Sequence, residues 1–246
     1  MRHAGRVPAG LDGCPNPLVT PERDRVLDAV ADVVREQRAP RKLVGVDGRS
    51  GAGKSTFADE LAGRLASGGL ATVRSTTDSF HRPRAERLAR GATSGDGYYL
   101  DSHQLGVVVD ELLVPFAAGA PEVRTAAFDE PSDAAVTTVE AVDPVAVLVF
   151  DGLFLQRPEL DDHWDVTIFL DAEVRRERAW VTFLLDDLPD DVVDRAATLD
   201  ARLARAHWPR YRDGWRAYVE AVDPKAAATV VVDNNDIGAP RIVGPG

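Results

Sequence analysis

The segment 48–55 constrains the fold of this chain more strongly than any other feature. It reads Gly-Arg-Ser-Gly-Ala-Gly-Lys-Ser and matches the pattern G-x-x-x-x-G-K-[ST] of a phosphate-binding loop. Such a loop has to follow a buried strand and open a helix. The apolar run 43–47 precedes it, and residues 55–65 place apolar side chains on one helical face. A chance match in a glycine-containing turn is the alternative, and this context argues against it.

Each residue type in the loop has a physical task. The glycines let the backbone curl so that successive N–H groups point at phosphate oxygens, and the positive end of the helix dipole adds to the attraction. Lys54 is expected to contact the β- and γ-phosphates, and Ser55 is expected to bind Mg²⁺. The residues predicted to bind the nucleotide are Gly48, Arg49, Ser50, Gly51, Ala52, Gly53, Lys54, Ser55 and Thr56.

Short apolar runs alternate with helical patterns along the rest of the chain. The predicted strands are 43–47, 71–76, 123–128, 136–142, 145–150, 166–170 and 229–233, and the predicted helices are 21–38, 55–65, 105–116, 172–185, 190–206 and 211–222. Residues 80–100 show no periodicity and are expected to form a long mobile or functional loop. The alternation predicts an α/β fold, a P-loop NTPase-type doubly wound parallel sheet with flanking helices and a small β insert near 121–142.

The domain organisation follows from the absence of repeats and linkers. Residues 1–20 contain Pro and Gly but no apolar h-region, so we expect a flexible leader rather than a signal peptide or anchor. Residues 21–246 are expected to form a single domain, with a substrate-side insert at about 80–142 and a lid at about 172–190.

The composition excludes several classes of protein. With 29 Lys plus Arg against 40 Asp plus Glu, the formal net charge is −11, which disfavours binding to nucleic acid or to an anionic membrane surface. The lone Cys14 cannot form an internal disulfide, which is typical of a reducing compartment. The longest strongly apolar run, 145–150, is too short to span a bilayer. We therefore expect a cytoplasmic protein, and a homo-oligomer is compatible with this composition.

Two carboxylates lie where phosphoryl transfer needs them. Asp78 follows the predicted strand 71–76, at the sheet edge where doubly wound folds bind ligands, and it could take a proton from a substrate hydroxyl. Asp151 ends the buried strand 145–150, from which a carboxylate reaches Mg²⁺. The structural alternatives are a helix N-cap for Asp78 and a turn residue for Asp151. His3, His103 and His163 show no zinc-site spacing.

These residues resemble the uridine kinase-like branch of the P-loop nucleoside kinases, which is related to phosphoribulokinase and bacterial pantothenate kinase. The resemblance is carried by residues 48–55, by Asp78-Ser79-Phe80-His81, by Phe150-Asp151-Gly152-Leu153-Phe154, by residues 155–160, 164–171 and 211–218, and by Val230-Val231-Val232-Asp233-Asn234. It covers most of the chain from about residue 41 to 240. It implies an ATP- and Mg²⁺-dependent kinase that phosphorylates the 5′-hydroxyl of a pyrimidine ribonucleoside.

The resemblance also implies roles for particular residues. Asp78 matches the catalytic base of the family, and Asp151 together with Ser55 matches the Mg²⁺ ligands. Lys54 and the lid arginines, of which Arg176 and Arg178 are the candidates, match groups that stabilise the transferring phosphoryl. The residues that match the acceptor pocket are Asp78, Phe80, His81, Tyr98, Asp101, Phe128 and Asp129.

The chain departs from the family pattern at two places. The lid of the family continues with an Arg-Asp pair, but here Arg178 is followed by Ala179. The base-reading His that follows the aromatic-Asp turn is absent from residues 130–133. The acceptor therefore stays open among a nucleoside, pantothenate, nicotinamide riboside and a sugar. A nucleotide-binding switch without catalysis is the alternative from another class, and it would not need Asp78.

Overall fold

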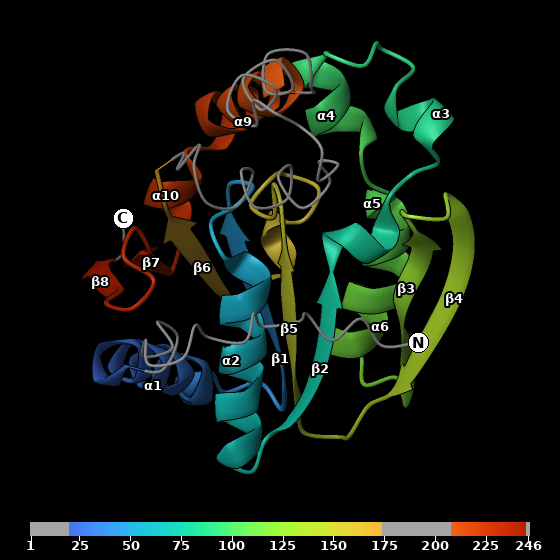
Figure 1. Ribbon diagram of the computed structural model, residues 1–246. Helices are drawn as coiled ribbons and strands as arrows, with labels where there is room; N and C mark the ends of the chain where they lie inside the picture. Colours follow the sequence, from blue (N-terminus) through green and yellow to red (C-terminus); the bar gives the residue numbers. More distant parts are fainter. Residues whose placement is uncertain (1–19, 174–207, 245–246) are drawn as a thin grey trace, which may run out of the picture.

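The computed structural model describes residues 20–173 and 208–244 as an α/β fold (Figure 1). The main helices are α1 (Pro21–Glu36), α2 (Lys54–Ser67), α4 (Gly95–Asp101) and α9 (Trp208–Val222), with short helices α3 (Arg84–Arg87), α5 (Leu105–Val108), α6 (Val114–Ala117) and α10 (Pro224–Ala227). The strands are β1 (Arg41–Gly48), β2 (Ala71–Thr76), β3 (Glu122–Asp129), β4 (Ala134–Ala141), β5 (Ala146–Gly152), β6 (Val166–Asp171), β7 (Val230–Asp233) and β8 (Arg241–Gly244). Single helical turns are η1 (Thr77–Phe80), η2 (Val109–Leu113) and η3 (Asp161–His163).

The central sheet has the strand order β2-β5-β1-β6-β7-β8, and the first five of these strands are parallel. The predicted parallel sheet is therefore confirmed, with one addition. The strand β8 pairs antiparallel with β7 at the edge. It was not predicted, because four largely exposed residues carry no alternating apolar signal.

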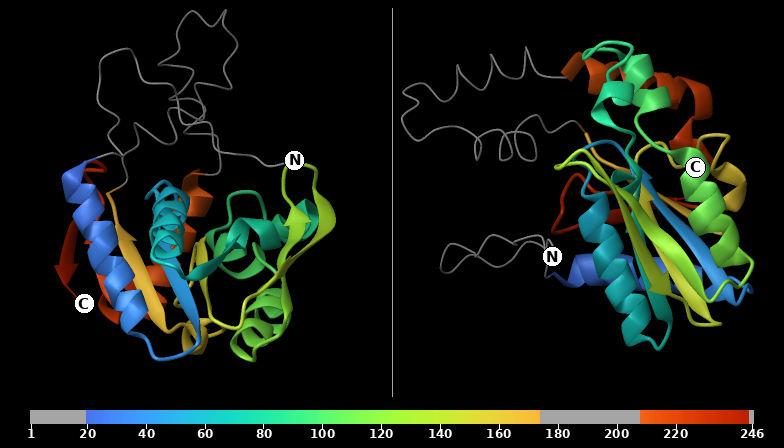
Figure 2. Two further views of the ribbon diagram at one scale, coloured as in Figure 1. Left: turned by 90° about the horizontal axis from the view of Figure 1, so that it is seen from below. Right: turned by 90° about the vertical axis from the view of Figure 1, so that its right-hand side faces the viewer.

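The sheet is covered on both faces, as Figure 2 shows in its right-hand view, where α2 and the helical segment 105–117 lie on opposite sides. Alternate side chains of one strand pack against the helices on opposite faces of the sheet. In β5, Val147 and Val149 pack against α1 and α2, whereas Leu148 and Phe150 pack against the opposite layer. Because both faces are buried, these strands are continuously apolar and not alternating, which is the pattern that the sequence displays.

The helix α1 begins where the sequence predicts. Thr20 is its N-cap, with a side chain that accepts a hydrogen bond from Arg23 N, and Pro21 occupies the first helical position. The helix ends at Glu36. Its apolar face packs against α2, so that both helices lie over the same side of the sheet.

The segment 80–100 is not the structureless loop that was expected. It contains α3 and α4, which are too short for a helical period to be recognised in the sequence. Figure 1 shows α4 side by side with α9 above the carboxyl ends of the strands. The two helices touch at Gly95 and Gly214, where an added Cβ would meet backbone atoms at 2.8 Å.

The β insert is present as predicted. The strands β3 and β4 pair antiparallel as a separate two-stranded sheet beside β2. The predicted helix 105–116 is also present as one continuous helical segment, with a wider π-helical turn over η2 in its middle. The predicted helices 172–185 and 190–206, most of the lid and nearly all of the leader lie outside the described residues.

Candidate functional site

The phosphate-binding loop joins β1 to α2 and has the backbone that its glycines predict. Gly48, Gly51 and Gly53 have φ values of 151°, 79° and 86°, which a residue with a side chain rarely adopts. At Gly48 a Cβ would also lie 2.8 Å from the carbonyl oxygen of Leu170. The loop therefore requires glycine there for two reasons, the backbone angle and the close approach of β6.

Lys54 lies at the first turn of α2 and is held by the loop itself. Its Nζ donates a hydrogen bond of 3.0 Å to the carbonyl oxygen of Arg49. Burial lowers the pKa of Lys54, while the carboxylates of Asp47, Asp78 and Asp151 oppose that shift. The ammonium group thus lies among acidic side chains at the carboxyl edge of the sheet.

Ser55, in the first turn of α2, meets Asp151 at the end of β5, the strand that pairs with β1. Ser55 Oγ donates to Asp151 Oδ2 at 2.8 Å, and Arg74 Nη2 lies 2.7 Å from Asp151 Oδ1. Only 2% of Asp151 is exposed. A hydroxyl and a carboxylate are the hard oxygen donors that Mg²⁺ prefers, so the pair fits the predicted ion. Arg74 holds the carboxylate in place, a partner that the sequence did not indicate.

A cavity of about 620 Å³ opens above this pair at the carboxyl edge of the sheet. It brings together the loop and the predicted acceptor side. The residues that line it are Ser50, Gly51, Gly53, Lys54, Ser55, Thr56, Thr76, Asp78, His81, Arg84, Arg87, Leu88, Tyr98, Ser102, Glu130, Asp151, Gly152, Leu153, Arg210 and Tyr211. Its volume is that of a typical ligand pocket.

Asp78 is exposed in this cavity and is not the helix cap that was the structural alternative. Thr76 caps the turn η1, and its side chain accepts a hydrogen bond from Asp78 N. The carboxylate of Asp78 therefore makes no cap hydrogen bond of its own. The turn presents it to the cavity on the same side as Lys54.

His81 and Tyr98, which are both predicted to contact the acceptor, line this cavity. His81 Nδ1 lies 3.0 Å from the carbonyl oxygen of Asp78. Tyr98 packs edge to face against Tyr211 at 4.7 Å between ring centroids. Burial raises the pKa of the Tyr98 hydroxyl well above its usual range, so the group stays protonated at neutral pH.

The two predicted acceptor-pocket phenylalanines lie elsewhere. Phe80 is fully buried, and its ring centroid lies 6.3 Å from that of Phe150 in the core. Phe128 is 4% exposed at the end of β3. Neither ring lines the cavity. Direct contact of these rings with the acceptor stays a prediction. An apolar ring that follows a strand can enter the core as well as the site, and the sequence does not distinguish the two.

The two remaining predicted acids are also outside the cavity lining. Asp101 accepts a hydrogen bond of 2.6 Å from Arg90 Nε. Asp129 accepts bonds from the backbone and the hydroxyl of Ser132, in the turn between β3 and β4. Both carboxylates have local structural partners, and their contact with the acceptor stays a prediction.

Arg49 lies on the side of the phosphate-binding loop that faces away from the main cavity. Arg49 does not line the main cavity; its guanidinium lies over the ring of Trp215, 5.8 Å from the centroid. It lines a separate cavity of about 250 Å³ with Asp171 and Lys225. The predicted lid arginines, Arg176 and Arg178, lie outside the described residues.

Three arginines outside the sequence motifs line the cavity near His81 and Tyr98: Arg84, Arg87 and Arg210. Arg210 is 4% exposed, and its guanidinium donates to the carbonyl oxygens of Ser94 and Arg87 at 3.3 and 2.9 Å. The Arg-rich segment after His81 was a visible signal. Arg210 had none, because α9 reaches the cavity only through tertiary packing.

A buried hydrogen-bond network around Asp47, next to the loop, also has no signal in the sequence. Asp47 is fully buried at the end of β1 and accepts hydrogen bonds from Gly48 N at 2.7 Å, from Gln156 Nε2 at 3.2 Å and from the hydroxyl of Tyr218. Burial raises the pKa of Asp47, and the three hydrogen bonds offset part of that rise. The network ties the start of the loop to α9.

One curated protein has a sequence similar to part of this chain. A uridine kinase from Leuconostoc citreum is 26% identical over 132 residues, which is 53% of this chain and 62% of that protein, so the match spans less than two thirds of the relative. No protein-family model matches the chain. Among the described residues, no helix has the length and apolar character needed to cross a membrane.

Solved structures share the fold. A possible uridine kinase from Bacillus stearothermophilus is 21% identical, with a TM-score of 0.66 over 85% of this chain and 97% of that one. A proposed fructose transport system kinase from Silicibacter sp. is 24% identical, with a TM-score of 0.60 over 80% and 94% of the two chains. The predicted P-loop fold is thereby confirmed, and the chain is similar to the uridine kinase-like P-loop kinases.

Proposed function

We propose that this protein is an ATP-dependent kinase that transfers the γ-phosphoryl group to a hydroxyl of a small molecule. The observation that carries the proposal is one cavity lined by Lys54, by the Ser55–Asp151 pair and by Asp78. A nucleotide-binding switch has no use for an exposed carboxylate beside the loop lysine. The likeness to a uridine kinase supports the same reaction class.

In this proposal, the position of each residue in the cavity decides its role. The amides of the loop and Lys54 hold the β- and γ-phosphates, and the Ser55–Asp151 pair would hold Mg²⁺, which neutralises charge on the phosphates. Asp78 orients the acceptor hydroxyl and takes its proton as the oxygen attacks the γ-phosphorus. Catalysis is then positioning and electrostatics. Arg176 and Arg178 remain our proposed lid groups.

The first proposed acceptor is a pyrimidine nucleoside with its free 5′-hydroxyl. The likeness to a uridine kinase supports it, and the exposed parts of Tyr98 and Tyr211 supply aromatic surface in the cavity. The base-reading His of the family is absent, so recognition of the base would use other groups.

The second candidate is a hydroxylated acceptor that carries a carboxylate or phosphate, and the three arginines favour it. Arg210 donates to carbonyl oxygens, and Arg84 has no ion pair among the described residues. Arg87 is paired with Glu130 at 3.1 Å. A neutral nucleoside does not need this much positive charge, whereas an anion is bound well by guanidinium groups.

The test is product formation with MgATP and a panel of acceptors, read by mass spectrometry. The panel holds uridine, cytidine, nicotinamide riboside, pantothenate, glycerate and neutral sugars. We expect a phosphorylated product from at least one acceptor. Tight ATP binding without any product would contradict the kinase proposal and favour the switch.

Arg84→Gln separates the two acceptor classes. For an anionic acceptor, KM should rise about tenfold or more, since a hydrogen bond to a charged group contributes about 1.5–3 kcal/mol. For a nucleoside, KM should barely change. Arg82→Gln is the matched control, because Arg82 precedes the same helix but does not line the cavity.

A further inference from the structure

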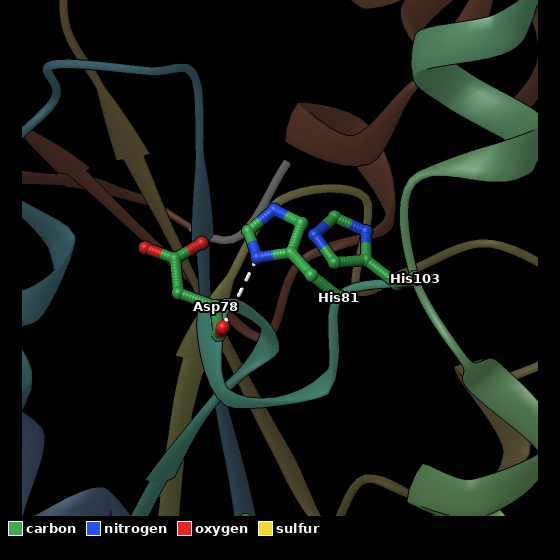
Figure 3. Close-up of side chains that lie close together, drawn as sticks. All are labelled: Asp78, His81 and His103. Carbon is green, nitrogen blue, oxygen red and sulfur yellow. Dashed lines mark hydrogen bonds between the residues drawn. The ribbon is translucent and has the colours of Figure 1, made fainter. Parts of the chain in front are cut away.

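Two histidines lie side by side next to the cavity because two distant segments pair there. Gln104 N donates to Phe80 O at 2.8 Å, and Arg82 N donates to Ser102 O at 2.9 Å. His81 and His103 are opposite each other between these bonds. In such a non-hydrogen-bonded pair the side chains approach closely, and the two ring centroids are 4.8 Å apart. Figure 3 shows the two rings together with Asp78.

The backbone of Asp78 selects the tautomer of His81. A carbonyl oxygen can only accept, so the 3.0 Å contact with Asp78 O requires the proton on Nδ1 of His81. The Nε2 atom then carries a lone pair. An imidazole whose second nitrogen donates to a backbone carbonyl is the usual arrangement of a metal-binding histidine.

His103 supplies an independent sign of a missing ligand. Its side chain is buried, with 4% of the residue exposed, and its Nε2 has no hydrogen-bond partner among the described residues. Leaving a buried polar atom unpaired costs about 1–3 kcal/mol. Burial lowers the pKa of His103 well below its usual range, so the ring is neutral at pH 7. Figure 3 shows one ring nitrogen turned toward His81.

We propose that Asp78, His81 and His103 bind a divalent transition-metal ion such as Zn²⁺. One candidate ligand atom from each residue lies within 4.8 Å of the other two. Bond lengths of about 2.0–2.2 Å to the ion require the side chains to close in, and the exposed Asp78 is free to turn. Two imidazoles and one carboxylate suit Zn²⁺, Co²⁺ or Fe²⁺ and disfavour Mg²⁺, which selects oxygen donors.

The charges around the cluster allow a cation. Arg157 and Arg87 are the nearby positive groups that act on His103. Arg157 is paired with Glu159 at 2.7 Å, and Arg87 is paired with Glu130 at 3.1 Å. Both of these charges are therefore compensated locally. Arg84, Arg210 and Lys54 line the same cavity and oppose a cation, whereas the carboxylate of Asp78 favours one on the open side.

The site is distinct from the Ser55–Asp151 pair but shares Asp78 with the proposed chemistry. An ion bound there withdraws the carboxylate of Asp78 from the acceptor hydroxyl. If the proposed kinase function holds, Zn²⁺ therefore inhibits it even at saturating Mg²⁺. Metal binding itself does not depend on that function.

The binding test uses the full chain with any oligohistidine tag removed. Zn²⁺ is titrated by calorimetry, and Co²⁺ is followed by its visible d–d absorption. We expect His103→Gln to lower the affinity of this site by more than about tenfold, because even indirect partners of a metal cost that much. His81→Gln should do the same, and excess Mg²⁺ should not displace the ion.

His163→Gln is the matched control, since His163 is half-buried and outside the cluster. His3 and Cys14 are present in every variant, so any binding there is a common background. His103→Asn and thermal unfolding of each variant show whether a loss of binding reflects a loss of fold. Equal binding by the wild type and a folded His103 variant would overturn the proposal.

Measuring kinase activity beside Zn²⁺ binding separates the metal-site proposal from the kinase proposal. Zn²⁺ binding without any kinase product would leave the metal site standing and remove the kinase. If folded His103→Gln raises KM for the acceptor but Zn²⁺ does not bind, the histidine pair is an acceptor contact and the metal proposal is wrong.

Discussion

Asp78 and Lys54 lie on one side of the cavity, and we expect their replacement to affect different steps of the proposed reaction. Asp78 is exposed, and only its backbone N–H takes part in the cap of the turn, by donating to Thr76 Oγ1, so removing the side-chain charge should leave the turn intact. Lys54 is held inside the loop by its hydrogen bond to Arg49 O and is the proposed contact to the phosphates. At the scale of single residues, the proposal therefore assigns proton transfer and nucleotide binding to different side chains.

Asp78→Asn should lower kcat by about 100-fold or more, which is the usual contribution of a general base, while the affinity for ATP changes little. The measurement is steady-state kinetics beside equilibrium binding of a fluorescent ATP analogue. Asp129→Asn is the control, because that carboxylate lies outside the cavity. Full activity of Asp78→Asn would show that the base is another group.

Asp47 makes stability depend on pH in an unusual direction. Burial raises its pKa in the folded protein above the ordinary value of 3.8. The folded state thus holds this proton more tightly than the unfolded state, and the resulting stability is present below pH 3.8 and lost as pH rises through the folded pKa. The free energy of unfolding of the wild type, relative to Asp47→Asn, should fall as pH rises from about 4 toward neutrality. Urea denaturation at several pH values measures it, and a relative stability that rises instead would contradict the raised pKa.

At the scale of elements, the packing of α4 on α9 sets the acceptor side. The contact at Gly95 and Gly214 lets the two helices approach closely, and this places Tyr98 of α4 beside Tyr211 of α9. Arg210 extends from α9 back to the carbonyl oxygens of Arg87 and Ser94. The acceptor wall is thus built from segments more than a hundred residues apart.

Gly214→Ala should push the helices apart. Its Cβ would lie 2.8 Å from Gly95 O and 2.9 Å from Tyr98 Cδ1, and overpacking of this kind costs about 1–3 kcal/mol. We expect a lower Tm and a higher KM for the acceptor. Gly106→Ala is the control, because nothing lies within 4 Å of its added Cβ; a Gly214→Ala protein as stable as this control would show that the contact is not tight.

At the scale of the whole molecule, the proposed kinase function requires a chain with a formal net charge of −11 to bind a highly charged nucleotide. In that proposal the loop amides, Lys54 and the Ser55–Asp151 pair attract the nucleotide only locally. A nucleotide that binds the folded loop and not the unfolded chain should stabilise the entire fold through mass action.

MgATP at a hundred times its Kd should raise the free energy of unfolding by about 2.7 kcal/mol. Thermal unfolding at increasing MgATP concentration measures this. Lys54→Ala should lose most of the effect, while its fold without nucleotide stays comparable. An unchanged Tm of the wild type at saturating nucleotide would contradict binding at the loop.

The features that could be predicted from the sequence are those that depend on residues close together in the chain. The loop, its flanking strand and helix, and the Ser55–Asp151 pair were predictable, because neighbouring parallel strands end at one edge and local glycines dictate the turn. The burial of Phe80 and Phe128 was not predictable, since an aromatic ring at a strand end can face the core or the site.

The sequence by itself determined the α/β layering, the phosphate-binding loop and the acids at the sheet edge, because periodicity and glycine positions act over a few residues. Only the tertiary structure decided the acceptor side: it brought Arg210 beside Tyr98, Tyr218 onto Asp47 and His103 beside His81. These contacts depend on the packing of α9 and on the pairing of segments 80–82 and 102–104. Such long-range interactions leave no periodic signal in the chain.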